Sequence, residues 1–141
     1  GCGNLFAFAW SVDGAEVLSV RAEREALQLT PGVSRTFDLA SPGPDLEVEA
    51  RVANRAGFDW GLCTDVRVLQ PGDEDEPWRA VSGLLTIQVA APGLRVSQPW
   101  RYRASINLSD AEFVGPTGNR VRLSRPVTMT TWVGSIGGPT R

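Results

Sequence analysis

The ionisable side chains of this 141-residue chain are carboxylates and guanidinium groups almost throughout. All 14 basic residues are arginine, 16 residues are Asp or Glu, and histidine and lysine are absent. Histidine is the usual base beside a serine or cysteine nucleophile, and a Schiff base requires lysine. A GC-rich genome accounts for the arginine bias equally well, but under either account the composition leaves only carboxylate chemistry to consider.

Carboxylate-dependent glycoside hydrolysis needs only two acidic groups, which face each other about 5–9.5 Å apart. Candidates for such a pair are Asp59, Asp65, Asp110 and Glu112. With 16 acidic residues some pair will always look suitable, and a small all-β domain rarely supplies the deep cleft that such sites use. We therefore expect a protein that is not an enzyme, with hydrolysis as the second alternative.

The densest acidic cluster is Asp73-Glu74-Asp75-Glu76, between Pro71-Gly72 and Pro77. Four carboxylates on one turn can hold a hard cation such as calcium, and Asp73 and Asp75 are the candidate ligands. However, the spacing is not that of an EF-hand loop, and acidic hairpin tips are usually solvated. We expect no bound metal and no cofactor.

Five tryptophans are many for a chain of this length. Trp10 and Trp60 are in phase with apolar rows and are expected to be buried. The other three stand at strand entries or out of phase, beside three arginines, and form a candidate surface for a protein partner or, alternatively, for a sugar: Trp78, Trp100, Trp132, Arg79, Arg101 and Arg103. Aromatic side chains together with arginine are typical of protein interfaces.

Turn signals along the chain indicate the elements that must position these groups. They are Asp13-Gly14, Pro31-Gly32, Pro42-Gly43-Pro44, Pro71-Gly72-Asp73, Pro92-Gly93 and Gly115-Pro116-Thr117-Gly118-Asn119. Turns of this kind between short alternating segments are typical of strands. A helix over Ala15 to Leu29 is the alternative for that segment, which fits a strand equally well.

Period-2 alternation predicts about nine strands and the residues that point inward. It is clearest where Leu46, Val48, Ala50 and Val52 alternate with Glu47, Glu49 and Arg51. The other expected inward rows are Phe6, Phe8, Trp10 and Val12; Leu18 and Val20; Phe37 and Leu39; Trp60, Leu62, Val66 and Val68; Leu85, Ile87 and Val89; Tyr102, Ala104, Ile106 and Leu108; Val121 and Leu123; and Val127, Met129, Thr131 and Val133.

Strands of this kind, with no alternating helices, must close against each other as two packed sheets or as one sheet closed on itself. We predict an all-β, antiparallel two-sheet sandwich in one domain. Residues 1–12 are expected to form an N-terminal anchor segment and first strand, residues 13–133 the sandwich, and residues 134–141 a Gly/Pro-rich tail.

Neither nucleic acid nor a lipid bilayer is an expected partner of the domain body. The net charge is -2 with acidic and basic residues interleaved, so there is no basic field to attract nucleic acid. No apolar run reaches the roughly 18 to 20 residues that span a bilayer. Membrane attachment is therefore expected only through a lipid on Cys2.

The N-terminal residues Gly1-Cys2-Gly3-Asn4 resemble the cleavage region of bacterial lipoproteins, in which a lipid-modified cysteine follows a small residue. Gly1 departs from that pattern, since a mature lipoprotein would begin at the cysteine. In the competing interpretation Cys2 forms a disulfide with Cys63, which requires an oxidising compartment. Both interpretations place the protein in the bacterial cell envelope, as a periplasmic or membrane-anchored lipoprotein, or outside the cell. Two free thiols would argue for the cytoplasm.

The strand count, the Trp on a central strand and the Pro-Gly turns resemble immunoglobulin-like and fibronectin-like sandwiches. The Cys-Trp-Cys signature of antibody domains is missing, because Trp60 precedes Cys63 by three residues and Cys2 lies at the N-terminus. The resemblance implies architecture alone. We expect a non-catalytic accessory or structural binding domain that contacts a protein partner, such as a membrane complex.

Overall fold

The computed structural model describes residues 5–12, 15–52, 77–91 and 101–134, without the side chains of residues 101 and 132–134. All regular structure in these ranges is β-strand, which confirms the all-β class. The strands are β1 (Leu5–Trp10), β2 (Glu16–Ala22), β3 (Ser34–Asp38), β4 (Leu46–Val52), β5 (Trp78–Val89), β6 (Arg101–Val114), β7 (Arg120–Arg122) and β8 (Val127–Gly134). A search of these residues for a helix long and apolar enough to cross a membrane finds none.

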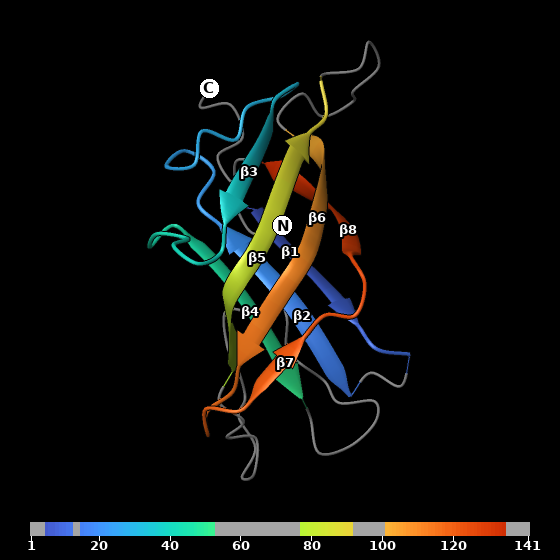
Figure 1. Cartoon of the computed structure of the whole chain (residues 1–141). Helices are drawn as coiled ribbons and strands as arrows, with labels where there is room; N and C mark the ends of the chain where they lie inside the picture. Colours follow the sequence, from blue (N-terminus) through green and yellow to red (C-terminus); the bar gives the residue numbers. More distant parts are fainter. Residues whose placement is uncertain (1–4, 13–14, 53–76, 92–100, 135–141) are drawn as a thin grey trace, which may run out of the picture.

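The eight strands belong to one antiparallel hydrogen-bonded sheet (Figure 1). Its order is β1-β2-β4-β5-β6-β7, with β3 also paired to β5 and β8 to β6. The predicted pairing of two separate sheets is not confirmed, since hydrogen bonds link all the described strands. The segment over Ala15 to Leu29, for which a helix was the alternative, contributes strand β2.

The sheet folds over, so that one half faces the other. In Figure 1, β5 and β6 cross in front of β1, β2 and β4. The turn occurs along β5, where Trp78 and Arg79 pair with β4 while Leu84 to Gln88 pair with β3. On the opposite side β8 approaches β1, and the Thr131 hydroxyl donates a hydrogen bond to the Phe6 carbonyl oxygen over 2.7 Å. The space between the two halves is therefore enclosed from both sides.

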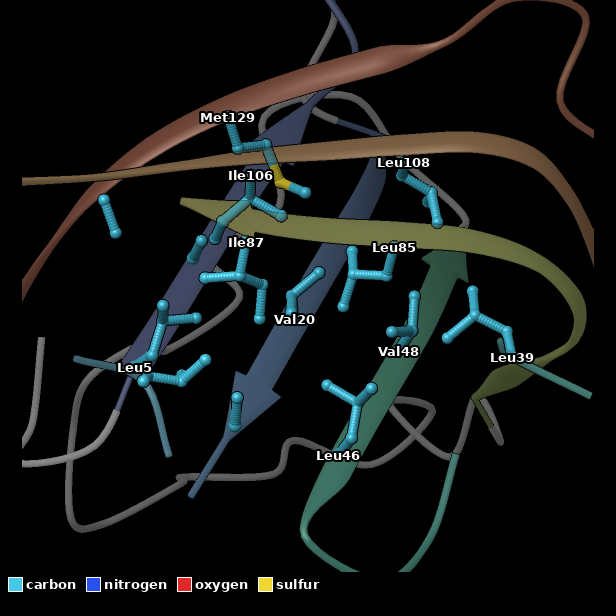
Figure 2. Packing of buried hydrophobic residues seen from close by; sticks show 14 of the residues in the cluster. Leu5, Val20, Leu39, Leu46, Val48, Leu85, Ile87, Ile106, Leu108 and Met129 are labelled. Carbon is cyan, nitrogen blue, oxygen red and sulfur yellow. The ribbon is translucent and has the colours of Figure 1, made fainter. Parts of the chain in front are cut away.

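The core fills this space with aliphatic side chains from both halves, as Figure 2 shows. The predicted inward rows Leu85-Ile87-Val89 and Ala104-Ile106-Leu108 are confirmed, because all six residues are buried. Leu29 and Leu39 enter the core from the segments that flank β3. Burial of such side chains typically contributes about 1.5–3 kcal/mol each, which makes this contact the main stabilising term of the fold.

The predicted orientation of β1 is wrong. Leu5 and Ala7 are buried, whereas Phe6 and Phe8 are half-buried and Trp10 is 55% exposed. Every residue of Leu5–Trp10 is apolar, so the alternation contains no polar row that would mark the outer face. The aromatic side chains instead contact each other, with ring centroids 5.7 Å apart for Phe6 and Phe8 and 4.9 Å apart for Phe8 and Trp10.

A second departure from simple alternation lies in the middle of β6. Leu108 and Ala111 are both buried, although three positions separate them. Asp110 has a φ of 54°, and the pairing of β5 with β6 shifts register opposite this point. A bulge of this kind lets the strand turn its side chains to a new face. It directs Phe113 inward at the end of β6.

Candidate functional site

A pocket of about 480 Å³ opens at the end of the molecule where β7 lies in Figure 1. Its walls come from the end of β1, the start of β2, the ends of β4 and β6, and the start of β5. The segment from Val121 to Val127, which leads from β7 to β8, contributes the remaining wall. The pocket thus lies between the two halves of the folded sheet, next to the core.

The wall that β1, β2 and β4 form is recessed, because two of its three inward residues are alanines. Ala9, Leu18 and Ala50 are register partners across β1, β2 and β4 and point toward the interior. In the adjacent row the partners are Ala7, Val20 and Val48, which are buried in the core. The row at the sheet end has alanine in place of valine on β4, where Ala50 corresponds to Val48, and the small side chains of Ala9 and Ala50 leave room there. Apolar side chains from the other half complete the lining: Trp78, Phe113, Leu123 and Val127.

Large apolar side chains also surround the mouth. Trp10 is 55% exposed, and Val52 and Val121 are exposed to a similar degree, although all three line the pocket. Val121 was predicted to point inward, and that prediction is wrong. The Phe8 ring meets Trp10 edge to face at an interplanar angle of 63°, which fixes the indole beside the opening.

The charged groups among the described lining residues are Arg51, Arg125 and Glu16. Arg51 Nη2 donates a hydrogen bond to Glu49 Oε2 over 3.1 Å, and Arg79 Nη2 lies 3.9 Å from Glu49 Oε1. Glu49 was expected on a solvated face, but it is only 6% exposed. In the described part of the chain, Arg125 has no carboxylate within ion-pair distance.

Of the candidates for a hydrolytic pair, Asp59 and Asp65 lie outside the described ranges. Asp110 and Glu112 pair with Arg122 and Arg120 of β7, at 3.4 and 3.0 Å. Among the described lining residues, Glu16 is the one that is acidic. Within the described ranges, no group of three or more acidic or cysteine side chains is placed to hold a metal ion. The chemistry that the pocket offers is apolar contact with a few charged groups at its wall.

The structure separates the residues predicted to contact a partner. Trp78 is half-buried and lines the pocket, and the neighbouring Arg79 is exposed and pairs with Val114 at the end of β6. Arg103 is exposed near the other end of β6, where its register partner is Trp132; the backbone of Arg101 also lies there. The remaining predicted site residues lie outside the described ranges: Cys2, Cys63, Asp73, Asp75 and Trp100; so does Trp60.

Of the predicted contact residues, Trp78 lines the pocket; the sequence did not indicate most of the other lining residues. Trp10 was assigned to the core because it continues an apolar row, and Ala9 and Ala50 carry no chemical signal of their own. One available signal was the alternation of Phe and Trp with alanine in β1, which puts either bulky or small side chains toward the interior. Only the pairing with β2 and β4 decides between these orientations.

Comparison of the chain with protein-family models, with curated proteins and with solved structures gives no match.

Proposed function

We propose that this chain is a non-catalytic binding domain whose binding site is the pocket between the two halves of the sheet. The observation that carries the proposal is a cavity of about 480 Å³ that combines an apolar lining with an exposed tryptophan at its mouth. Pockets for small molecules typically measure about 300–1,000 Å³ and are lined mainly by apolar and aromatic side chains with few polar groups. Soluble domains otherwise keep such surface covered.

Filling the recessed wall is expected to weaken the binding of a neutral apolar probe. The probe is N-phenyl-1-naphthylamine, whose fluorescence rises in apolar surroundings. Ala50→Phe places a ring in the pocket, because Ala50 is half-buried and lines it. We expect the affinity for the probe to fall at least about tenfold, which corresponds to the loss of roughly 1.4 kcal/mol of contact. Fluorescence titration measures the change.

The matched control is Ala90→Phe, because Ala90 is exposed and lies outside the pocket lining. This variant should retain the affinity of the parent chain. Trp10→Ala supplies a second test that leaves the core untouched, since the indole is largely exposed. An unchanged probe affinity in both Ala50→Phe and Trp10→Ala, with both variants folded, would contradict the proposal.

A protein partner at the same mouth is the second candidate. The observation that favours it is the exposed apolar rim of Trp10, Val52 and Val121 beside Arg51 and Arg125. Tryptophan and arginine are the residues that most often dominate protein interfaces. Chemical crosslinking in the source cells tests this candidate, and a captured protein that competes with the probe for purified chain would support it.

The cell-envelope setting is also a proposal, supported by the resemblance of Gly1-Cys2-Gly3-Asn4 to lipoprotein cleavage regions. The immunoglobulin-like architecture is likewise a proposal, and the two facing halves of the sheet support it. Intact mass of natively purified protein under non-reducing conditions checks the setting. Acyl chains on Cys2 or the loss of two protons in a Cys2–Cys63 disulfide are the expected results, and two free thiols would argue against an envelope location.

A further inference from the structure

We infer that the pocket binds a single-chain amphiphile with a carboxylate head, that is, a fatty acid. The inference rests on the proposed binding function and names the class of ligand for it. Two features of the lining carry it: the apolar walls on both sides, which suit an aliphatic chain, and Arg125, which suits an anionic head.

The apolar part of the ligand is accommodated by the interior of the pocket. Ala9, Leu18 and Ala50 form one wall, and Phe113, Leu123 and Val127 come from the other half of the sheet. None of these six offers a side-chain donor or acceptor; the uncharged lining residues that do are Ser11, Ser124, Trp10 and Trp78. Against the six apolar side chains, the hydroxyl groups of a sugar would lose their hydration without replacement hydrogen bonds, whereas an alkyl chain has no polar group to leave unpaired.

The head group is selected by Arg125. Arg51 also belongs to the lining, but its guanidinium is held by Glu49 through the 3.1 Å hydrogen bond, on the face of β4 opposite to Ala50. Arg125 is exposed and has no carboxylate partner in the described part of the chain, so its donors are available to a ligand. Arginine binds carboxylates through two parallel hydrogen bonds.

Glu16 is the one charge at the pocket that opposes this assignment. It is exposed at the start of β2, where water screens its interaction with a ligand. A cationic amphiphile is the ligand class that Glu16 would favour. The experiment therefore compares acid, alcohol and amine heads on the same alkyl chain.

Displacement of N-phenyl-1-naphthylamine by decanoate, decanol and decylamine tests the inference on the full chain at low ionic strength. We expect decanoate to displace the probe at a concentration about tenfold lower than decanol, with decylamine weakest, because a charge-assisted hydrogen bond to arginine favours the acid. Equal potency of acid and alcohol, or stronger binding of the amine, would overturn the inference and leave the proposed function intact. If the probe itself fails to bind, the proposed function fails as well.

Arg125→Gln separates the contribution of the ligand's head group to affinity from that of its alkyl chain. We expect decanoate to lose about tenfold in affinity and decanol to remain unchanged, because only the acid contacts the guanidinium. Arg120→Gln is the matched control: it removes an exposed arginine of β7 that pairs with Glu112 of β6 and does not line the pocket. An equal loss for acid and alcohol in Arg125→Gln, or an equal loss of decanoate in both variants, would contradict the role of Arg125.

Discussion

Gly83→Ala is expected to lower the free energy of unfolding by about 2–6 kcal/mol, with roughly 1–3 from overpacking and roughly 1–3 from backbone strain. A β-carbon at this position would lie 2.6 Å from Ala111 Cα and 2.9 Å from both Ala111 N and Ser109 O. These are backbone atoms of the neighbouring strand β6, which cannot move aside as a flexible side chain can. Folded domains have total stabilities of only about 5–15 kcal/mol, so urea denaturation should detect the loss easily.

The backbone of Gly83 adds to the cost for two reasons. Its φ of 117° is one that residues with a β-carbon rarely adopt. Its carbonyl oxygen also accepts a hydrogen bond of 2.9 Å from the amide of Leu39, whose side chain is buried in the core. A shift of Gly83 away from β6 therefore disturbs the segment that follows β3 as well.

Gly118→Ala is the matched control, because Gly118 also has a positive φ, of 80°, but its added β-carbon would meet nothing within 4 Å. Only the backbone term applies there, roughly 1–2 kcal/mol. The difference between the two variants isolates the contact of Gly83 with Ala111. Equal losses in the two variants would show that the close approach of β5 and β6 does not contribute.

Sequence reasoning succeeded where polar and apolar residues alternate strictly. The inward rows of the central strands are marked by residues such as Gln88 and Asn107 on the opposite face, so Ile87 and Ile106 were assigned to the core correctly. In β1 both rows are apolar, and the orientation depends on pairing with β2 and on the aromatic contacts that the outer row makes. Long-range pairing of this kind is not encoded in local alternation.

The bulge in β6 explains a second kind of failure. The prediction assumed that successive side chains point to opposite faces of the sheet. Asp110 interrupts this alternation because its backbone adopts a left-handed conformation. Aspartate tolerates this conformation better than most residues, but its presence does not require it. The position of Phe113 at the pocket, and therefore the site itself, depends on this shift.

The pocket could not be predicted for a related reason. A cavity forms where side chains are too small to fill the space between strands. Ala9 and Ala50 mark such a place only because both are register partners of Leu18, and that pairing cannot be seen in the sequence. Trp78 was identified as a contact residue from its place at a strand entry, and it does line the pocket. The sequence thus indicated some of the side chains that line the pocket, whereas the pocket itself could be located only from the folded structure.

Glu49 is a buried carboxylate whose hydrogen-bond partner, Arg51, belongs to the pocket lining. The glutamate belongs to the polar row of β4, which was expected to be solvated throughout, yet only 7% of its side chain is exposed, compared with 45% for Glu47 in the same row. Its carboxylate joins Arg51 on its own strand and Arg79 on β5. It therefore lies where β4 pairs with β5, at one of the junctions between the two halves of the sheet.

Glu49→Gln is expected to lower the free energy of unfolding by about 2–3 kcal/mol. Removing one partner of a buried ion pair commonly costs about 3–5 kcal/mol because the other charge is left uncompensated. Here the cost is smaller, because the Arg51 side chain is 24% exposed to water and the side-chain amide oxygen that the substitution introduces can still accept a hydrogen bond from it. Thermal or urea denaturation at neutral pH measures the change.

Glu47→Gln provides the control two residues along the same strand. Its pair with Arg21 is longer, at 3.7 Å, and both side chains are largely exposed, so its loss should cost no more than about 1 kcal/mol. Neither variant should change the preference for decanoate over decanol, because neither carboxylate belongs to the pocket lining. Equal effects of the two substitutions on stability would mean that burial of the carboxylate at the junction of β4 and β5 does not contribute.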